Sequence, residues 1–181
     1  MLTINIPGNE RWDERINQFV YDKPVMLRLE HSLLSLSKWE SSWHKPFLDD
    51  TKPKTPEETL DYVRCMTVTQ GVDPEVYNRL TRANMAAIQR YMQDPMTAAT
   101  FKDRKNGKKR ARYQSAETFY AAMASYGIPF ECEKWHLNRL LALIRACGEE
   151  NMPPDKMGKR EQALHTRALN AQRRAKMHSR G

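Results

Sequence analysis

The chain has 181 residues, of which 40% are hydrophobic and 29% charged. This is enough for one compact domain, or for one domain plus an appendage, and the aromatic content excludes a disordered chain. No apolar run approaches the roughly 18 residues that a membrane-spanning helix needs. The N-terminus lacks a basic stretch followed by an apolar one, so we expect no signal peptide. An odd number of widely spaced cysteines argues against a disulfide framework and favours a reducing cytoplasm.

The formal net charge of +8 is concentrated in two segments. Residues 102–112 carry seven basic side chains and one acidic one, and residues 156–181 carry eight basic side chains and one acidic one. The rest of the chain has a formal net charge of −5. Such segments typically face polyanions or acidic protein surfaces, although a solvated surface and a solubilising tail have the same composition. The candidates for polyanion binding are Lys102, Arg104, Lys105, Lys108, Lys109, Arg110 and Arg112.

The first 31 residues predict a small antiparallel β element. Apolar and polar residues alternate over residues 2–6 and 25–30, which is the period of a half-buried strand. Turn-forming residues interrupt the pattern at 7–9 and 22–24. We expect two or three short strands, and they require a body to pack against because an isolated hairpin is marginally stable.

A helical body is predicted over residues 32–150. An apolar helical stripe runs from Leu33 through Trp39 and Trp43 to Phe47. We expect the helix to end around Pro46. Residues 55–58 have the composition of a capping box with proline at the first helical position, and Gly71 is a plausible end of that helix. A similar cap followed by proline begins at Asp73 and leads into a helix.

The next predicted helix covers residues 82–93 and places Met85, Ile88 and Met92 on one face. The basic segment 101–113 is either an exposed hairpin, centred on Asn106 and Gly107, or a mobile loop; we favour the loop.

Ser115 then caps a helix that ends at Gly127, and residues 128–130 read as extended. The densest apolar helix is expected at 133–147, largely buried, with Leu140 and Leu141 in the core. Proline residues at 153 and 154 separate a basic, helix-prone tail, so we expect a single globular domain over 1–150 and a tail over 151–181. The predicted fold is therefore mainly α with a small N-terminal antiparallel β element (α+β), a bundle-like helical body and a basic helical C-terminal tail.

No catalytic constellation is evident from the sequence. Phosphate-binding loops and nucleophile elbows are absent as motifs. Cys132 and His136 could share a helical face, but a zinc site needs three or four ligands and no second close pair is present. We therefore expect no enzymatic activity, no cofactor and no metal.

Three segments of the chain carry a resemblance. They resemble segments of small proteins encoded in the tail-gene regions of long-tailed bacteriophages. The first segment combines residues 29–33 and 37–48 (LEHSL and SKWESSWHKPFL), the second is 129–141 (PFECEKWHLNRLL) and the third is 167–174 (RALNAQRR). The resemblance covers about residues 25–175. Such proteins resemble tail assembly chaperones, or are described only as tail-region proteins, and their motifs carry no catalytic residues.

The resemblance implies a non-enzymatic chaperone that binds the long helical tape-measure protein in the host cytoplasm, with a longer frameshifted product in some families. The candidate partner contacts are Trp39, Trp43, Met85, Ile88, Met92, Arg173 and Arg174. For Trp39 and Trp43, core packing is the main alternative. A structural component of the virion, at the tail or head-tail junction, remains a rival interpretation. So does a small nucleic-acid-binding protein, which the acidic body makes the less favoured of the two. The protein could also associate with itself. We expect no membrane partner.

Overall fold

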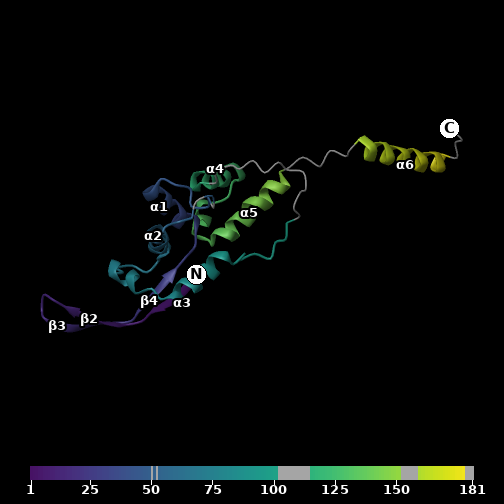
Figure 1. Cartoon of the computed structure of the whole chain (residues 1–181). Helices are drawn as coiled ribbons and strands as arrows, with labels where there is room; N and C mark the ends of the chain where they lie inside the picture. The colour runs from purple at the N-terminus through teal and green to yellow at the C-terminus, as the bar shows by residue number, and fades with distance from the viewer. Residues whose placement is uncertain (50, 52, 102–114, 152–158, 178–181) are drawn as a thin grey trace. The chain divides into compact units, whose positions relative to one another are not determined.

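The computed structural model describes residues 1–49, 51, 53–101, 115–151 and 159–177 of the chain (Figure 1). It is mainly helical with a small antiparallel β element at the N-terminus, as the sequence predicts. The chain divides into two compact units, Met1–Gly148 and Glu149–Gly181. The predicted polyanion-binding residues between 102 and 112 lie outside the described residues, as does the choice between hairpin and loop for that segment.

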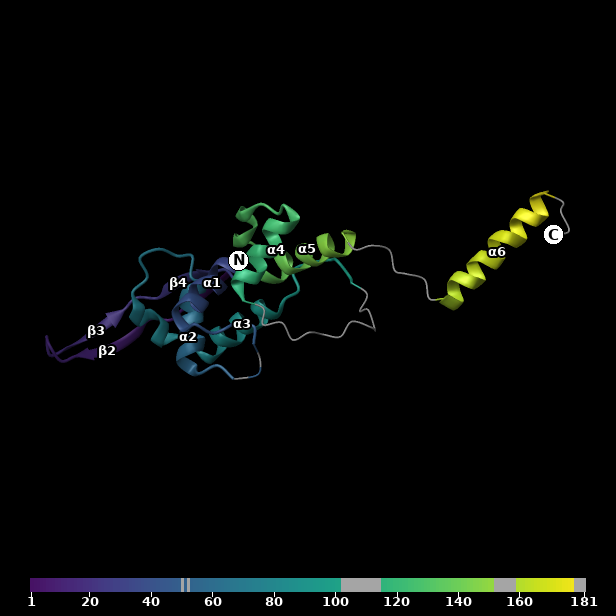
Figure 2. The same cartoon turned by 90° about the horizontal axis from the view of Figure 1, so that it is seen from above.

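The N-terminal strands form one continuous β-hairpin. β1 (Leu2–Ile6) pairs antiparallel with β4 (Val25–Leu29), and β2 (Asn9–Asp13) pairs antiparallel with β3 (Gln18–Asp22). Both ladders keep the same register, which places Pro7 opposite Pro24 where pairing is interrupted. Proline has no N–H to donate, so the ladder breaks there and resumes beyond. In Figures 1 and 2, β2 and β3 extend away from the helices.

The half of the hairpin nearer the body is anchored in the core. Ile4, Ile6, Leu27 and Leu29 are buried on one face. Residues 66–68 hydrogen bond along β4: the Glu30 N–H donates to the Met66 carbonyl and the Val68 N–H to the Arg28 carbonyl, each at 2.8 Å. The predicted helix end at Gly71 is therefore wrong, because α2 (Pro56–Met66) ends where the chain begins to pair with β4.

Local capping fixes the start of several helices. α2 has the predicted capping box, with Thr55 and Glu58 bonded reciprocally, and α3 (Arg82–Gln93) begins with a similar box at Thr81. α1 (Leu33–Trp43) is capped by Ser32 and ends at His44, whose φ of 52° is left-handed. The helix thus stops before Pro46, and Phe47 leaves the predicted stripe while remaining buried. The predicted helix after Asp73 is the short 3₁₀ helix η1 (Pro74–Arg79).

α4 (Ala116–Tyr126) begins at Ser115 and ends at the left-handed Gly127, both as predicted. The prediction that the Ser115 side chain caps this helix is wrong, because Ser115 makes no side-chain capping bond. Instead, the carboxylate of Glu40 on α1 accepts hydrogen bonds from the Ala116 and Phe47 N–H groups, each at 2.7 Å. Burial raises the pKa of Glu40, and these two bonds oppose that rise. Glu40 therefore ties the start of α4 and the segment after α1 to the middle of α1.

The predicted helix over 133–147 is wrong at its start. Phe130–Lys134 form a 3₁₀ helix, η2, the chain extends at Trp135, and α5 covers Leu137–Glu150. Trp135 is 37% exposed, with the Arg139 guanidinium 4.4 Å from the ring centroid, so it lies outside the core. Leu140 is fully buried as predicted, whereas Leu141 is only partly buried.

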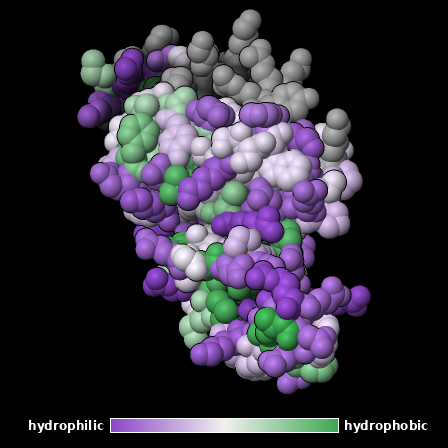
Figure 3. All heavy atoms as spheres, turned by 90° about the vertical axis from the view of Figure 1, so that its left-hand side faces the viewer, coloured by the Kyte–Doolittle hydropathy of each residue, from purple (hydrophilic) through white to green (hydrophobic). Residues whose placement is uncertain are grey.

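The second unit contains α6 (Lys159–Met177). Its described side chains, residues 163–177, are exposed. The first unit also presents hydrophobic side chains at its surface: Figure 3, which views the molecule from the side of β2 and β3, shows green hydrophobic atoms among purple hydrophilic ones.

Candidate functional site

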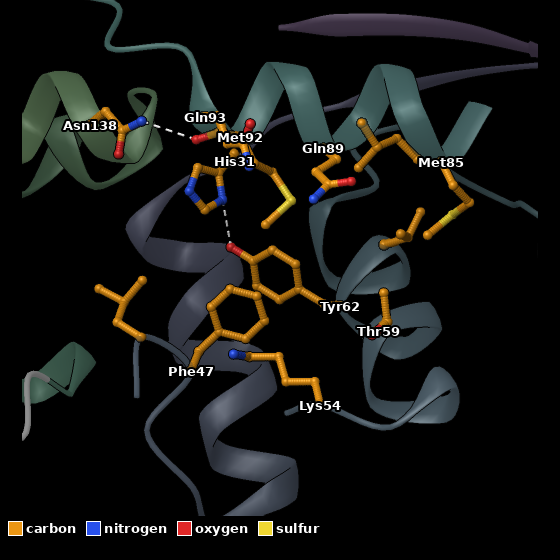
Figure 4. Close-up of a pocket in the computed structure, with 13 residues that line it drawn as sticks. His31, Phe47, Lys54, Thr59, Tyr62, Met85, Gln89, Met92, Gln93 and Asn138 are labelled. Atoms are coloured by element: carbon orange, nitrogen blue, oxygen red, sulfur yellow. Dashed lines mark hydrogen bonds between the residues drawn. The ribbon is translucent and has the colours of Figure 1, made fainter. Parts of the chain in front are cut away.

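An open groove of about 480 Å³ lies between α2 and α3 (Figure 4). Helix α2 contributes side chains at a spacing of three and four residues, and α3 contributes a facing set, so each helix directs one stripe into the groove. The segment after α1 and the start of α5 close its ends. The lining residues are His31, Phe47, Leu48, Lys54, Thr59, Tyr62, Val63, Met85, Ile88, Gln89, Met92, Gln93 and Asn138.

Packed aromatic rings form the floor of the groove. Phe47 stacks on Tyr62 with ring centroids 3.7 Å apart, and the Trp39 and Phe47 rings meet at nearly a right angle with centroids 5.0 Å apart. Tyr62 is 2% exposed, and its hydroxyl is hydrogen bonded to Nδ1 of His31 at 2.7 Å. The floor is therefore rigid, because its one buried hydroxyl is satisfied and its rings are in contact.

His31 is held in the neutral form. Burial lowers the pKa of His31 to about 4, and the electrostatic effect of His136, whose ring centroid is 5.2 Å away, adds to the shift. Nε2 of His136 donates to the Tyr91 carbonyl at 3.0 Å, so its Nδ1 is left to accept the Asn138 N–H at 3.3 Å. Near neutral pH the inner end of the groove therefore carries no positive charge on His31.

The rim combines flexible apolar side chains with one charge. Met85 and Met92 of α3 and Leu48 are partly buried, and Gln89 and Gln93 are exposed. The ammonium group of Lys54 lies 4.6 Å from the Phe47 ring centroid. Among the lining residues, all of which are described, Lys54 is the only one charged near neutral pH. The groove can therefore hold apolar side chains and favours an acidic group beside them.

Asn138 holds α3 in place at the end of the groove. Its side-chain amide donates to the carbonyls of Met92 and Asp94, at 3.0 and 2.7 Å (Figure 4 shows the bond between Asn138 and α3). These carbonyls lie in the last turn of α3 and at its C-cap, where the helix supplies no internal donor. These two bonds tie the end of α3 to the start of α5 at this end of the groove.

The structure brings together some of the predicted partner residues and separates others. Met85 and Met92 lie on the rim of the groove and Ile88, 2% exposed, in its floor. Trp39 is 1% exposed and donates its indole N–H to the Glu58 carbonyl at 2.8 Å, so the core-packing alternative holds for it.

Trp43 is partly buried, and its indole N–H donates to the Asp61 carboxylate at 2.9 Å. Its ring stacks on Trp39 at 6.0 Å. Arg173 and Arg174 belong to α6 in the second unit, where both are exposed.

Sequence reasoning missed His31, Phe47, Lys54 and Tyr62 as groove residues. Phe47 was assigned to a helical stripe that ends before it, and nothing local indicates that His31 meets Tyr62. One signal was available: Thr59, Tyr62 and Val63 form a narrow stripe on the helix that comes before the Met85 face in the chain. Two such neighbouring stripes predict a helix pair with a seam between them.

Within the described part of the chain, no group of three or more His, Cys, Asp or Glu side chains is placed to hold a metal ion. Likewise, no helix in those residues combines the length and apolar character needed to cross a membrane. Comparison of the chain with protein-family models finds no match, and searches of curated proteins and of solved structures find none either.

Proposed function

We propose that this protein is a non-enzymatic tail assembly chaperone of a long-tailed bacteriophage, and that the groove between α2 and α3 holds an amphipathic helix of the tape-measure protein. The observation that carries the proposal is the groove itself: an open apolar seam with two methionines on its rim and a single charge. Helix-in-groove binding uses apolar side chains at helical spacing, and methionine adapts to different side chains because it is unbranched and flexible.

The position of Lys54 defines the client more closely. The Lys54 ammonium group lies over the Phe47 ring at the groove edge, where a carboxylate on the client could reach it. We therefore expect client segments whose apolar stripe is flanked by Asp or Glu. We name the tape-measure protein as the client because residues 29–33, 37–48 and 129–141 resemble segments of phage tail-region proteins.

The proposal is tested by co-expressing the full chain with tape-measure fragments and measuring the affinity of the purified pair. Replacing both rim methionines, Met85→Lys with Met92→Lys, places charge where apolar side chains should be buried. We expect affinity to fall by about tenfold or more. The matched control is Met26→Lys, because Met26 is 65% exposed on the outer face of β4 and does not line the groove.

Circular dichroism of all variants checks that they remain folded. Equal binding by the rim variant and the control would place the interface elsewhere. Absence of co-purification with any fragment, together with tight and salt-dependent binding to DNA, would overturn the chaperone and favour the nucleic-acid-binding rival. Abundant protein in purified virions would instead favour a structural component.

A further inference from the structure

The distal part of the hairpin, residues 9–22, forms an arm with an exposed aromatic face. In the shared register, Trp12, Phe19 and Tyr21 continue the same face of the hairpin that is buried at Ile4 and Leu27. On the arm this face is exposed to solvent: the side chains of Trp12, Phe19 and Tyr21 are 48%, 72% and 60% exposed. Trp12 and Phe19 contact each other edge to face, with ring centroids 5.0 Å apart.

The arm has a fixed root. The Arg79 guanidinium donates to the carbonyls of Pro7 and Lys23, both at 3.3 Å, and to that of Asp22 at 3.5 Å, so it joins both strands where the ladder is interrupted. Gly8 allows the Tyr21 hydroxyl to approach the backbone, and a side chain there would collide with it. The arm is therefore a fixed extension of β1 and β4.

The two edges of the arm differ in character. β2 reads Asn-Glu-Arg-Trp-Asp, with three charged residues in five, whereas β3 reads Gln-Phe-Val-Tyr-Asp, with one. Charged side chains are a usual protection of an exposed strand edge against pairing with another chain. The edge of β2 has that protection and the edge of β3 lacks it. A two-stranded hairpin is also marginal in water, and additional strands stabilise it.

We propose that the edge of β3 pairs antiparallel with the β3 edge of a second copy of this chain, with Val20 of both copies facing each other on a two-fold axis. In this register Phe19 lies opposite Tyr21 of the second copy, and Tyr21 opposite its Phe19. Aromatic and β-branched cross-strand pairs of this kind stabilise sheets. The same operation on β2 would place Arg11 against Arg11 and Glu10 against Trp12, and like charges directly opposite are unfavourable.

The expected dimer is weak. A stable interface covers about 800 Å² per partner, and pairing one five-residue strand covers less than that. Association should therefore depend on protein concentration. The four-stranded sheet that results carries the aromatic side chains of both copies on one face, because residues paired across antiparallel strands lie on the same side.

The test places opposite charges at position 20, which lies on the two-fold axis. Self-association of the full chain is measured by sedimentation velocity over a range of protein concentrations. Val20→Lys and Val20→Glu should each weaken self-association by about tenfold or more, because each places like charges opposite each other. An equimolar mixture of the two variants should restore the dimer, since Lys now faces Glu. The control is Asn9→Lys, which adds the same single charge to β2 and should leave the dimer unchanged.

A wild-type chain that stays monomeric at every concentration would overturn the pairing. A dimer that survives both Val20 variants would overturn it equally, and so would failure of the mixture to restore association. None of residues 9–22 lines the groove. The groove variant Met85→Lys with Met92→Lys should therefore leave self-association intact, so that this inference and the proposed function can fail independently.

Discussion

Lowering the pH should destabilise this protein through His31, by an amount that can be worked from the structure. The His31 pKa is about 4 in the folded chain and about 6.5 in the unfolded one. Between those values the unfolded chain binds a proton that the folded chain does not, so stability is fully present above pH 6.5 and is lost as pH falls. From pH 7.5 to pH 5 the loss from His31 is about 2 kcal/mol.

Other groups also titrate over this interval, so the contribution of His31 has to be isolated by a variant. His31→Asn removes the titration, and the asparagine oxygen can occupy the position of Nδ1 beside the Tyr62 hydroxyl. Urea titrations at pH 7.5 and pH 5 give the free energy of unfolding of each protein at both pH values. We expect the decrease between pH 7.5 and pH 5 to be about 2 kcal/mol smaller in the variant than in the wild-type chain. The comparison uses only the pH difference within each protein, so an equal loss of stability at both pH values does not affect it.

Identical pH dependence of the two proteins would refute the reasoning. It would mean that folded His31 titrates near its ordinary pKa, and hence that water reaches the floor of the groove. The wild-type chain should also keep its near-ultraviolet circular dichroism at pH 5 while losing stability, because the packed rings of Phe47 and Tyr62 persist until the whole unit unfolds.

Three further substitutions test the core. Glu40→Gln should cost about 1–3 kcal/mol in urea unfolding, because the amide has one acceptor oxygen for the two N–H groups of Phe47 and Ala116; an unchanged stability would show that water can replace the lost acceptor. Leu140→Ala should cost about 2–5 kcal/mol and Leu141→Ala distinctly less, since only Leu140 is fully buried; equal losses would contradict the burial of α5.

The elements that sequence predicts well are those governed by local chemistry. The capping box at Thr55 and the left-handed end of α4 at Gly127 depend on residues within one turn of the boundary. The strand pattern is local in the same sense, since alternation identifies the buried face of β1 and β4. These features are correct because no distant residue has to be known.

The errors arise where distant segments decide the outcome. α2 ends before Gly71 because residues 66–68 pair with β4, nearly forty residues earlier in the chain. α4 is capped by Glu40 on another helix, although Ser115 stands in the usual position. The groove has the same origin: Met85 and Met92 were identified as a face, but its floor depends on His31 and Tyr62 meeting across the fold.

The groove and the arm suit different kinds of contact, and the difference bears on how a chaperone could coat a long client. The groove is bordered by flexible methionines and can accept varied apolar segments, whereas the arm presents rigid aromatic rings in one register. In the proposed function, copies bound along one tape-measure helix would hold their arms at high effective concentration. A contact too weak to dimerise dilute protein would then link neighbouring copies, because tethering makes the second binding event intramolecular. The groove can thus tolerate changes in the client sequence, whereas the contact between the arms of two copies stays specific.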